Sequence, residues 1–538
     1  MKAKILSLAA AVLLLCSLFL SAGCSIRADY LIGDVNGDGV VDAWDAYTLS
    51  RYLSGRFTPI SDENADLSFD GAITETDMQV LLEYLAGISK PGTRYASITI
   101  NGVDLEQYRI VIPEKDASFA AWAADQLRDE LENSCGVRLS IVTDDKAESE
   151  YEILIGDTSR AESENSVEFS PLSYMIYTEG SKIVLLGRDF MVGGGVGYLT
   201  HTLLSSSDGW NTQADITVPE DKLVREYQPQ TAESVILIIG DGMGQNHIRM
   251  ACDPDAQVQS PDGSVISAGA DFVETFWAAQ FPAAGTASTG NVLGGVTDSA
   301  AAATALSTGW KTRNGVLGMR PDSFLGDDAE SLRSVQNVRE LASLSGRTTA
   351  ILSTDRITGA TPNAFLVHHS YRYDYSIVRQ QQEALAESEL ACDFLWCSYD
   401  DDDLLEQLQK AIHAALVNDS GFFLMAEEAM IDKYATKLDY SETIRTVSRL
   451  NDCVAYAALT AACHPDIAVI VTADHETGGL TILEDGSYAW TSGGEHTGVP
   501  VPVYAIGGGT EVFHSTLVEN TDIAKYIASV FGAVSFGE

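Results

Sequence analysis

The stretch SVILIIGDGMG, residues 234–244, decides the fold of the larger part of this chain. A continuous run of β-branched and other apolar residues is typical of a strand buried on both faces of a parallel sheet. The stretch DIAVIVTADHETGG, residues 466–479, repeats this design, and 348–362 and 501–509 supply further strands with helices between them. We therefore expect an α/β fold in which helices flank a parallel-rich sheet.

Polar residues stand directly after these apolar runs. Asp241 follows the first run, and Asp474 and His475 follow the second. Ligands of open α/β sheets bind beyond the carboxyl ends of the strands, so these side chains are candidates for one shared site. Each of them, taken alone, also suits an ordinary turn or cap.

The stretch TDSAAAATALSTG, residues 297–309, reads as an alanine-rich helix with Asp298 and Ser299 at its start. One interpretation is a simple N-cap, because Ser and Asp are favoured there for stability alone. The other is a nucleophilic serine at a place where the helix dipole and unpaired N–H groups favour an anion.

Taken together and in order, these motifs resemble the metal-dependent alkaline phosphatase family over residues 232–535. The resemblance implies that Ser299 is the nucleophile with Asp298 beside it, that Arg372 in GATPNAFLVHHSYR binds phosphate, and that Lys433 lies near the phosphate. It also implies zinc and magnesium ligands, namely Asp241, Ser299, Thr361, Glu427, Asp432, Asp474, His475 and His496. Mixed Asp and His ligands suit zinc, whereas the all-oxygen set of Asp241, Thr361 and Glu427 suits magnesium.

The chemistry implied is hydrolysis of phosphate monoesters through a phosphoserine, with zinc activating the serine hydroxyl and then water. Two positions depart from the family pattern. Thr436 stands where the family has a zinc-binding histidine, and Gly359 stands where some relatives carry a charged or ring side chain. A catalytically weakened module that acts mainly by binding is therefore the alternative.

Residues 34–45, DVNGDGVVDAWD, and 66–77, DLSFDGAITETD, form an internal repeat. Each places oxygen side chains at loop positions one, three, five, nine and twelve and a glycine at six, which is the pattern of a calcium loop. The predicted calcium ligands are Asp34, Asn36, Asp38, Asp42 and Asp45 in the first loop and Asp66, Ser68, Asp70, Thr74 and Asp77 in the second.

Each loop is followed by a predicted helix that ends YLSG or YLAG. Residues 30–88 resemble an all-α, calcium-binding type I dockerin, which implies that a cohesin domain of a scaffold protein is the partner. Loop positions ten and eleven, which help to choose the cohesin in that family, are Ala43, Trp44, Glu75 and Thr76.

Between these regions, residues 96–225 alternate short β-like runs with one amphipathic helix over 118–136, which predicts a small α+β domain. It loosely resembles the accessory domains that precede the catalytic barrel in some carbohydrate-active enzymes. We expect a spacer or binding domain here.

The chain begins with Lys2, Lys4 and the apolar run 5–20, which predicts a signal peptide over residues 1–23. LSAGCS resembles a bacterial lipobox, so Cys24 is expected to carry a lipid anchor to the membrane; ordinary cleavage after Ala22 or Gly23 is the alternative. Both place the protein outside the cell or on its surface. With 33 Lys plus Arg against 77 Asp plus Glu, the net charge of −44 argues against binding to nucleic-acid phosphates.

Overall fold

The computed structural model describes most of the chain from residue 97 onward and parts of what precedes it. The described residues are 33, 35–36, 41, 43–56, 60, 65, 67, 73–85, 95 and 97–537, with gaps at 116, 165, 205–212, 260–263, 268–271, 322–331 and 419. These residues belong to two compact units. The first comprises Met1–Val167, Met175–Leu186 and Gly195–Val224, and the second comprises Glu168–Tyr174, Gly187–Gly194 and Arg225–Glu538.

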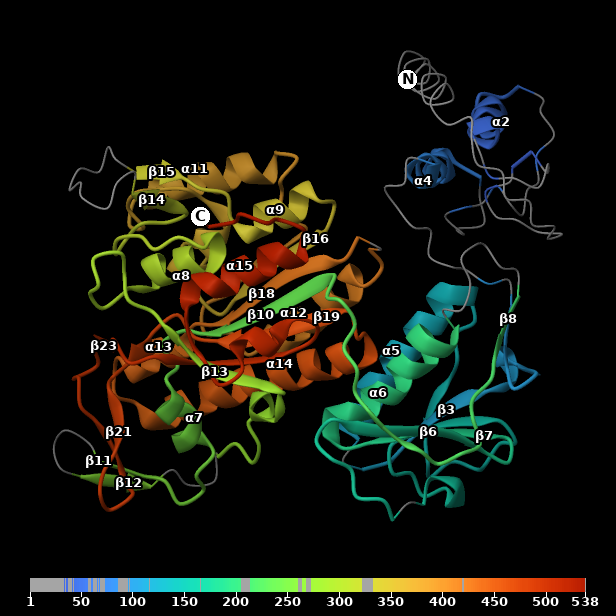
Figure 1. Ribbon diagram of the computed structural model, residues 1–538, viewed down its shortest axis with the longest axis horizontal. Coiled ribbons are helices and arrows are strands. Elements are labelled where there is room, and N and C mark those ends of the chain that lie inside the picture. The colour runs from blue at the N-terminus through green and yellow to red at the C-terminus, as the bar shows by residue number, and fades with distance from the viewer. Residues whose placement is uncertain are drawn as a thin grey trace. The chain divides into compact units, whose positions relative to one another are not determined.

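An eight-stranded sheet forms the core of the second unit (Figure 1). In spatial order its strands are β17 (Phe394–Cys397), β16 (Thr348–Ser353), β18 (Phe422–Glu428), β10 (Ser234–Gly240), β19 (Ile467–Thr472), β24 (Val501–Ile506), β13 (Ala283–Ser288) and β25 (Leu517–Glu519). β10 is parallel to β18 and β19, whereas β24 is antiparallel to both of its neighbours. The predicted α/β fold with a parallel-rich sheet is confirmed.

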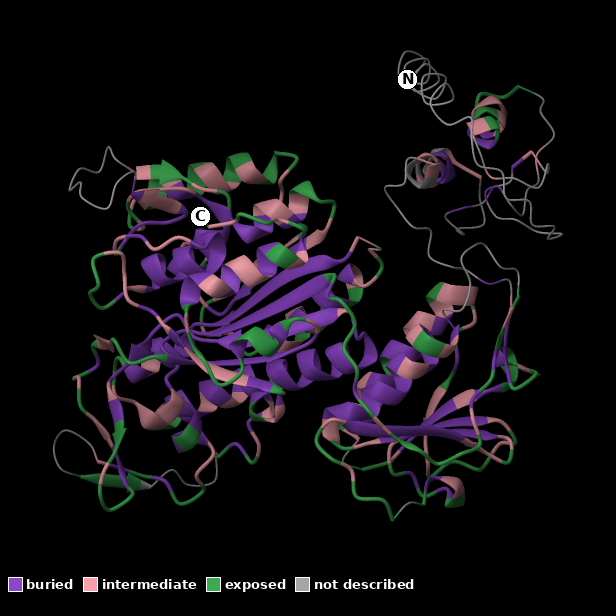
Figure 2. Cartoon of the chain, in the orientation of Figure 1, coloured by how far each residue is buried: buried purple, intermediate pink, exposed green. Residues whose placement is uncertain are grey.

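Helices cover both faces of this sheet (Figure 1). On one face lie α8 (Ser299–Thr308), α9 (Val338–Leu344), α10 (Ala360–Leu366) and α15 (Asn520–Val530); on the other lie α12 (Leu404–Ala415) and the long α14 (Tyr440–Cys463). All residues of β10, β18 and β19 are buried, as Figure 2 shows for the sheet. This double cover explains why the sequence of β10 is apolar without alternation.

The second unit also contains the helices α7 (Gln245–Ala251), α11 (Tyr375–Ala386) and α13 (Met430–Ala435). A separate four-stranded sheet has the order β12 (Val265–Ser267), β11 (Gln257–Gln259), β22 (Tyr488–Trp490) and β21 (Leu480–Ile482). The strand pair β20 (Glu476–Thr477) and β23 (His496–Thr497) stands apart from the main sheet and carries one of the candidate histidines.

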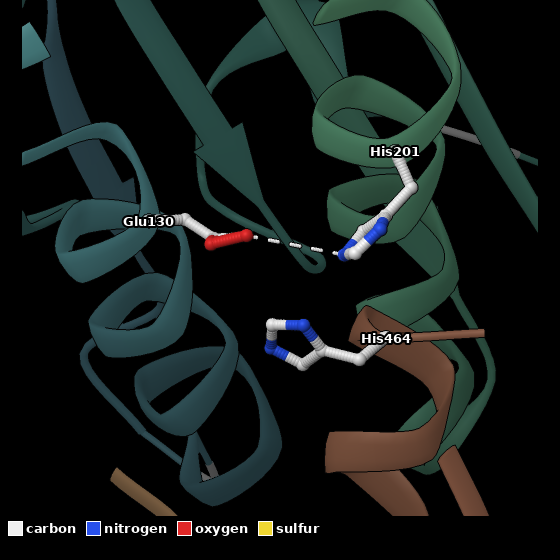
Figure 3. Close-up of side chains that lie close together, drawn as sticks. All are labelled: Glu130, His201 and His464. Atoms are coloured by element: carbon white, nitrogen blue, oxygen red, sulfur yellow. Dashed lines mark ion pairs between the residues drawn. The ribbon is translucent and has the colours of Figure 1, made fainter. Parts of the chain in front are cut away.

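The first unit contains a sheet with strands in the order β4 (Ile141–Thr143), β3 (Arg109–Ile112), β5 (Glu152–Ile155), β7 (Lys182–Gly187) and β6 (Ser173–Glu179). Its helix α5 (Ser118–Cys135) ends at Gly136, whose left-handed φ of 76° suits a glycine cap, in agreement with the predicted bounds. The strand β6 was not predicted from the sequence. α5 contacts the π-helix η4 (Tyr198–Leu204), where Glu130 Oε1 lies 3.9 Å from His201 Nε2 (Figure 3). The third side chain drawn there, His464, belongs to the second unit.

The two helices predicted after the calcium loops are present as α2 (Ala43–Leu53) and α4 (Glu75–Leu85), which contact each other. They share a core that includes Val35, Leu49, Leu67 and Leu81. None of the described helices is long and apolar enough to cross a lipid bilayer.

Several predicted residues lie outside the described part of the chain. These are Cys24 and the calcium candidates Asp34, Asp38, Asp42, Asp66, Ser68 and Asp70. Among the described candidates, the carboxylates at loop position twelve, Asp45 and Asp77, are fully buried. Asp45 Oδ1 accepts a hydrogen bond from Asn36 N at 3.0 Å, and Asp77 Oδ2 accepts one from Thr74 N at 2.7 Å.

Candidate metal and phosphate site

The candidate site lies at the carboxyl ends of three neighbouring strands. Asp241 follows β10, Glu427 lies near the end of β18, and Asp474 follows β19. Because these strands are parallel and adjacent, their ends share one edge of the sheet, and Asp241 and Asp474, 233 positions apart in the sequence, come together. The backbone N–H of Asp241 donates to Glu428 O at 3.1 Å, which fixes the first carboxylate beside β18.

Four side chains, Asp241, Asp474, His475 and Ser299, form what we call the serine-side cluster. His475 Nε2 lies 3.4 Å from Asp241 Oδ1, 3.3 Å from Asp474 Oδ2 and 3.3 Å from Ser299 Oγ. All four residues are buried, with exposed fractions between 0 and 4%. A cation at the meeting point of these atoms would find two carboxylates, one imidazole nitrogen and one hydroxyl within reach.

In the first turn of α8, Ser299 is not the N-cap residue. Asp298 is the N-cap, because its Oδ1 accepts from Ala301 N at 3.0 Å. Ser299 is the first helical residue, and its hydroxyl faces His475 rather than the backbone of its own helix. Ser299 therefore does not cap the helix, and it lies at the positive end of the helix dipole.

Asp432 on α13 and His496 on β23 form a second group, which we call the depleted cluster. His496 Nε2 lies 3.4 Å from Asp432 Oδ1, and its ring stacks on that of His475 with centroids 3.6 Å apart. Thr436, at the position where the family resemblance implies a histidine, follows α13 and is exposed to solvent. The depleted cluster thus has one carboxylate and one imidazole of its own.

In both His475 and His496, Nε2 is the ring nitrogen that faces the carboxylates. His496 Nδ1 lies 3.1 Å from Thr297 O, and His475 Nδ1 lies 3.3 Å from Thr477 Oγ1. A metal-binding histidine commonly donates its other ring N–H to such a group, which sets the tautomer and the ring orientation. Burial lowers the pKa of His475, so this imidazole is neutral and its Nε2 carries a lone pair.

A third group of oxygens lies on the far side of Asp241. Ser353 Oγ donates to Glu427 Oε2, and Thr361 on α10 has a buried hydroxyl beside this carboxylate. Burial, together with the charge of Asp355, raises the pKa of Glu427 to about 8. Burial and Asp474 also raise the pKa of Asp241 well above its ordinary value.

Two cations border these acids. Lys433 Nζ lies 3.2 Å from Asp432 Oδ2 and 3.5 Å from Asp241 Oδ2, and although burial opposes its charge, the two carboxylates raise the pKa of this lysine. Arg372 Nη1 lies 3.3 Å from Asp298 Oδ2, and its guanidinium carbon is 5.2 Å from the centre of the Tyr373 ring. An anion arriving at Ser299 would meet Arg372 next to the serine.

The side chains present fit metal ions. Among the described residues, Asp241 Oδ1, Asp474 Oδ2 and Thr361 Oγ1 are buried oxygens without a hydrogen-bond partner. Such orphaned oxygens are costly in a protein interior unless a cation or water satisfies them. A cation also lowers the repulsion among carboxylates whose pKa values burial has raised.

The structure also places residues that the sequence analysis did not single out. α10 ends at Leu366, and His368 and His369 lie in the following extended segment, where His369 pairs with Leu317. Thr477, Ser353 and Asp355 were not singled out.

Two known families match different parts of this chain. The alkaline phosphatase family model matches residues 232–395 and 385–494, and the dockerin type I model matches residues 32–86. Alkaline phosphatase 4 of Bacillus subtilis is 25% identical over 342 residues, which cover 52% of this chain and 68% of that protein. Alkaline phosphatase 4 of Drosophila melanogaster is 35% identical over 158 residues, and this chain spans only 25% of its length. The structure of alkaline phosphatase from the Antarctic bacterium TAB5 aligns with 57% of this chain and all of its own at 24% identity, with a TM-score of 0.46.

The second unit is thus an α/β domain with buried carboxylates and a histidine at the carboxyl ends of its central strands. The chain carries an alkaline phosphatase domain and, at its N-terminus, a type I dockerin domain. Dockerin domains bind cohesins in extracellular, cellulosome-type systems, and the alkaline phosphatase family uses metal ions.

Proposed function

We propose that the alkaline phosphatase domain hydrolyses phosphate monoesters with Ser299 as the nucleophile. The observation that carries this proposal is the position of the Ser299 hydroxyl. It begins α8, is freed from capping by Asp298, and lies 3.3 Å from the lone-pair nitrogen of His475 among two buried carboxylates.

Attack by Ser299 Oγ on phosphorus forms a phosphoserine as the bond to the alcohol oxygen breaks, and water then releases phosphate and restores the serine. Arg372 binds two phosphate oxygens, since a guanidinium presents paired donors to such a group. The N-terminus of α8 favours the same anion. Lys433, which already pairs with Asp432 and Asp241, adds positive charge near the phosphate.

The residues that would hold zinc are those of the serine-side cluster and of the depleted cluster, and Asp241, Thr361 and Glu427 would hold magnesium. When bound, these ions stabilise negative charge on the oxygens of phosphate, serine and leaving group. Thr477 and Thr297 contact the Nδ1 atoms of His475 and His496, so Nε2 of each ring is the atom available to a metal ion. Ser353 orients Glu427 through a hydrogen bond.

The test is turnover of p-nitrophenyl phosphate by the full chain, with zinc and magnesium titrated, beside Ser299→Ala and Ser307→Ala. Ser307 lies on the same helix, and its hydroxyl donates to Ala364 O at 2.9 Å, so it controls for damage to α8. We expect Ser299→Ala to lower kcat by at least about 10³-fold, as for other nucleophile deletions. Equal activity of Ser299→Ala and its parent would refute the proposal.

A second candidate function is a catalytically weakened module that acts mainly through its dockerin domain. The exposed position of Thr436 favours it, because the depleted cluster lacks one nitrogen ligand. The absence of turnover in the parent at any metal concentration, together with activity in Thr436→His, would support this alternative.

We further propose that the dockerin domain binds a cohesin domain of a scaffold protein when calcium fills its two loops. The α2 helix presents Trp44 and Tyr47, which are 65% and 45% exposed and pack edge to face, as an aromatic surface beside the first loop. Binding to a panel of cohesins with calcium, and its loss on chelation or in Asp45→Ala, tests this. No binding to any cohesin in the presence of calcium would count against it.

We also propose that a lipid on Cys24 attaches the protein to a membrane at the cell surface. The full chain should partition into detergent, and Cys24→Ser should partition into the aqueous phase. Equal partitioning of the two would favour ordinary signal cleavage.

A further inference from the structure

Thr477 lies between the two clusters. It is the second residue of β20 and pairs directly with His496 of β23, so the strand pair that carries the depleted cluster's histidine also carries this threonine. Its side chain is fully buried.

The hydroxyl of Thr477 contacts one residue of each cluster. Thr477 Oγ1 lies 2.6 Å from Asp432 Oδ1 and 3.3 Å from His475 Nδ1. In the shorter of these two contacts the Thr477 hydroxyl donates and the Asp432 carboxylate oxygen accepts. The single hydroxyl hydrogen of Thr477 therefore goes to Asp432, and the oxygen is left to accept the Nδ1–H of His475.

Gly242 of the GDGMG stretch makes this contact possible. Its φ is 74°, and a Cβ atom there would lie 2.7 Å from Thr477 Oγ1 and 2.9 Å from Asp432 Cα. The backbone N–H of Thr477 donates to Gly242 O at 3.1 Å, and Gly242 N donates to Asp474 Oδ1 at 3.0 Å. The peptide groups of Gly242 thus join Thr477 to the serine-side cluster a second time.

We propose that Thr477 is a positioning residue that holds both clusters in the arrangement that binds zinc; this inference rests on the proposed function for the identity of the metal. Its hydroxyl fixes the tautomer of His475, so that Nε2 faces Asp241, Asp474 and Ser299. The same hydroxyl holds the Asp432 carboxylate, on which the depleted cluster depends more heavily because Thr436 supplies no nitrogen. Neither role requires Thr477 to touch the substrate.

The test compares zinc binding by the full chain, its Thr477→Val and Thr477→Ser variants, and the control Thr446→Val. Valine keeps the shape and removes the hydroxyl, whereas serine keeps the hydroxyl and removes the methyl group. Thr446 is also fully buried, but its hydroxyl donates to Glu442 O and Thr443 O within its own helix. Zinc affinity is measured by competition with a chelator, and kcat and KM are measured in parallel.

Loss of a residue that orients a metal ligand costs about 10–100-fold in metal affinity. We therefore expect Thr477→Val to bind zinc about 10–100-fold more weakly, Thr477→Ser to recover most of this affinity, and Thr446→Val to match the parent. With zinc saturating, Thr477→Val should lose kcat more than it raises KM. Parental zinc affinity in Thr477→Val, or an equal loss in Thr477→Ser, would overturn the inference.

Zinc affinity and turnover separate this inference from the proposed function. Zinc binding that depends on the Thr477 hydroxyl in a parent without turnover would overturn the function alone. Turnover in the parent, with zinc binding that is indifferent to Thr477, would overturn the inference alone. A parent that binds no zinc would overturn the inference whatever its turnover.

Discussion

The serine-side cluster and the depleted cluster lie side by side but differ in how completely they are built. The first draws two carboxylates and an imidazole from the ends of β10 and β19, all fully or almost fully buried. The second consists of Asp432 and of His496, whose side chain is 27% exposed. Thr436, one helical turn after Asp432, is exposed to solvent. The residues around the proposed nucleophile therefore form a more complete and better buried set of metal-ligand types than the residues beside it.

The largest expected effect comes from breaking the better-built cluster with Asp474→Asn. Asp474 Oδ1 accepts from Gly242 N and His475 N, and an amide oxygen can keep both hydrogen bonds while the negative charge is lost. We expect zinc affinity and turnover to fall by about 100-fold or more. Metal analysis and p-nitrophenyl phosphate assays measure this, with Asp485→Asn in an exposed turn as the control. Turnover within a few-fold of the parent would mean that this cluster is not the reaction centre.

Restoring the depleted cluster with Thr436→His should give the next largest change. Thr436 stands four residues after Asp432 and its N–H donates to Asp432 O at 2.8 Å, so a histidine there lies on the same helical face. An added imidazole should raise zinc affinity by about 10–100-fold and raise turnover at limiting zinc. Lys437→His, which places the histidine one residue further on, is the matched control. Equal zinc binding by the two variants would show that ligand number does not limit this cluster.

Tyr373→Leu tests a contact outside both clusters and should have a modest effect. The ring of Tyr373 supports the Arg372 guanidinium, and an exposed cation–π contact contributes about 0.5–1 kcal/mol. We expect kcat/KM to fall about two- to five-fold, with zinc binding unchanged. Tyr375→Leu, which removes the neighbouring exposed tyrosine, should leave kcat/KM as it is. A change in zinc affinity would contradict the assignment of this tyrosine to the phosphate side.

The smallest effect concerns stability and pH, at a histidine remote from both clusters. His368 Nε2 lies 2.8 Å from Glu340 Oε1 and its Nδ1 lies 2.6 Å from Gly318 O; although burial opposes the charge, the hydrogen bond to Glu340 raises the pKa of His368. This stabilisation is fully present below about pH 6.5, the unfolded value, and is lost as the pH rises through the raised pKa.

His368→Gln should therefore cost about 1–2 kcal/mol of unfolding free energy at pH 6 and less at pH 9. Denaturant unfolding at both pH values measures this, with His369→Gln as the control. A cost that grows with pH would show that His368 is neutral in the folded protein.

Much of the fold could be predicted from local patterns. The unbroken apolar runs of β10 and β19 indicated strands covered on both faces, and the alanine-rich run with a terminal glycine indicated α8. The bounds of α5 followed from amphipathic spacing and a glycine cap, and the presence of α2 and α4 followed from the repeated loop and the endings YLSG and YLAG. The strand β6 was not predicted. The end of α10 before His368 was not predicted either, because a helix end without a glycine or proline leaves a weak signal in the sequence.

The sequence by itself determined that a serine, several acids and two histidines stand at strand ends and helix starts, since those positions follow from local pattern and motif order. Only the tertiary structure decided that Asp298 rather than Ser299 caps α8, that Thr436 faces solvent, and that Thr477 joins Asp432 to His475. The link made by Thr477 depends on which side chains meet across β20, α13 and the segment after β19. Such meetings between segments far apart in the chain are fixed by sheet order and by the close approach that Gly242 allows, and no local pattern encodes them.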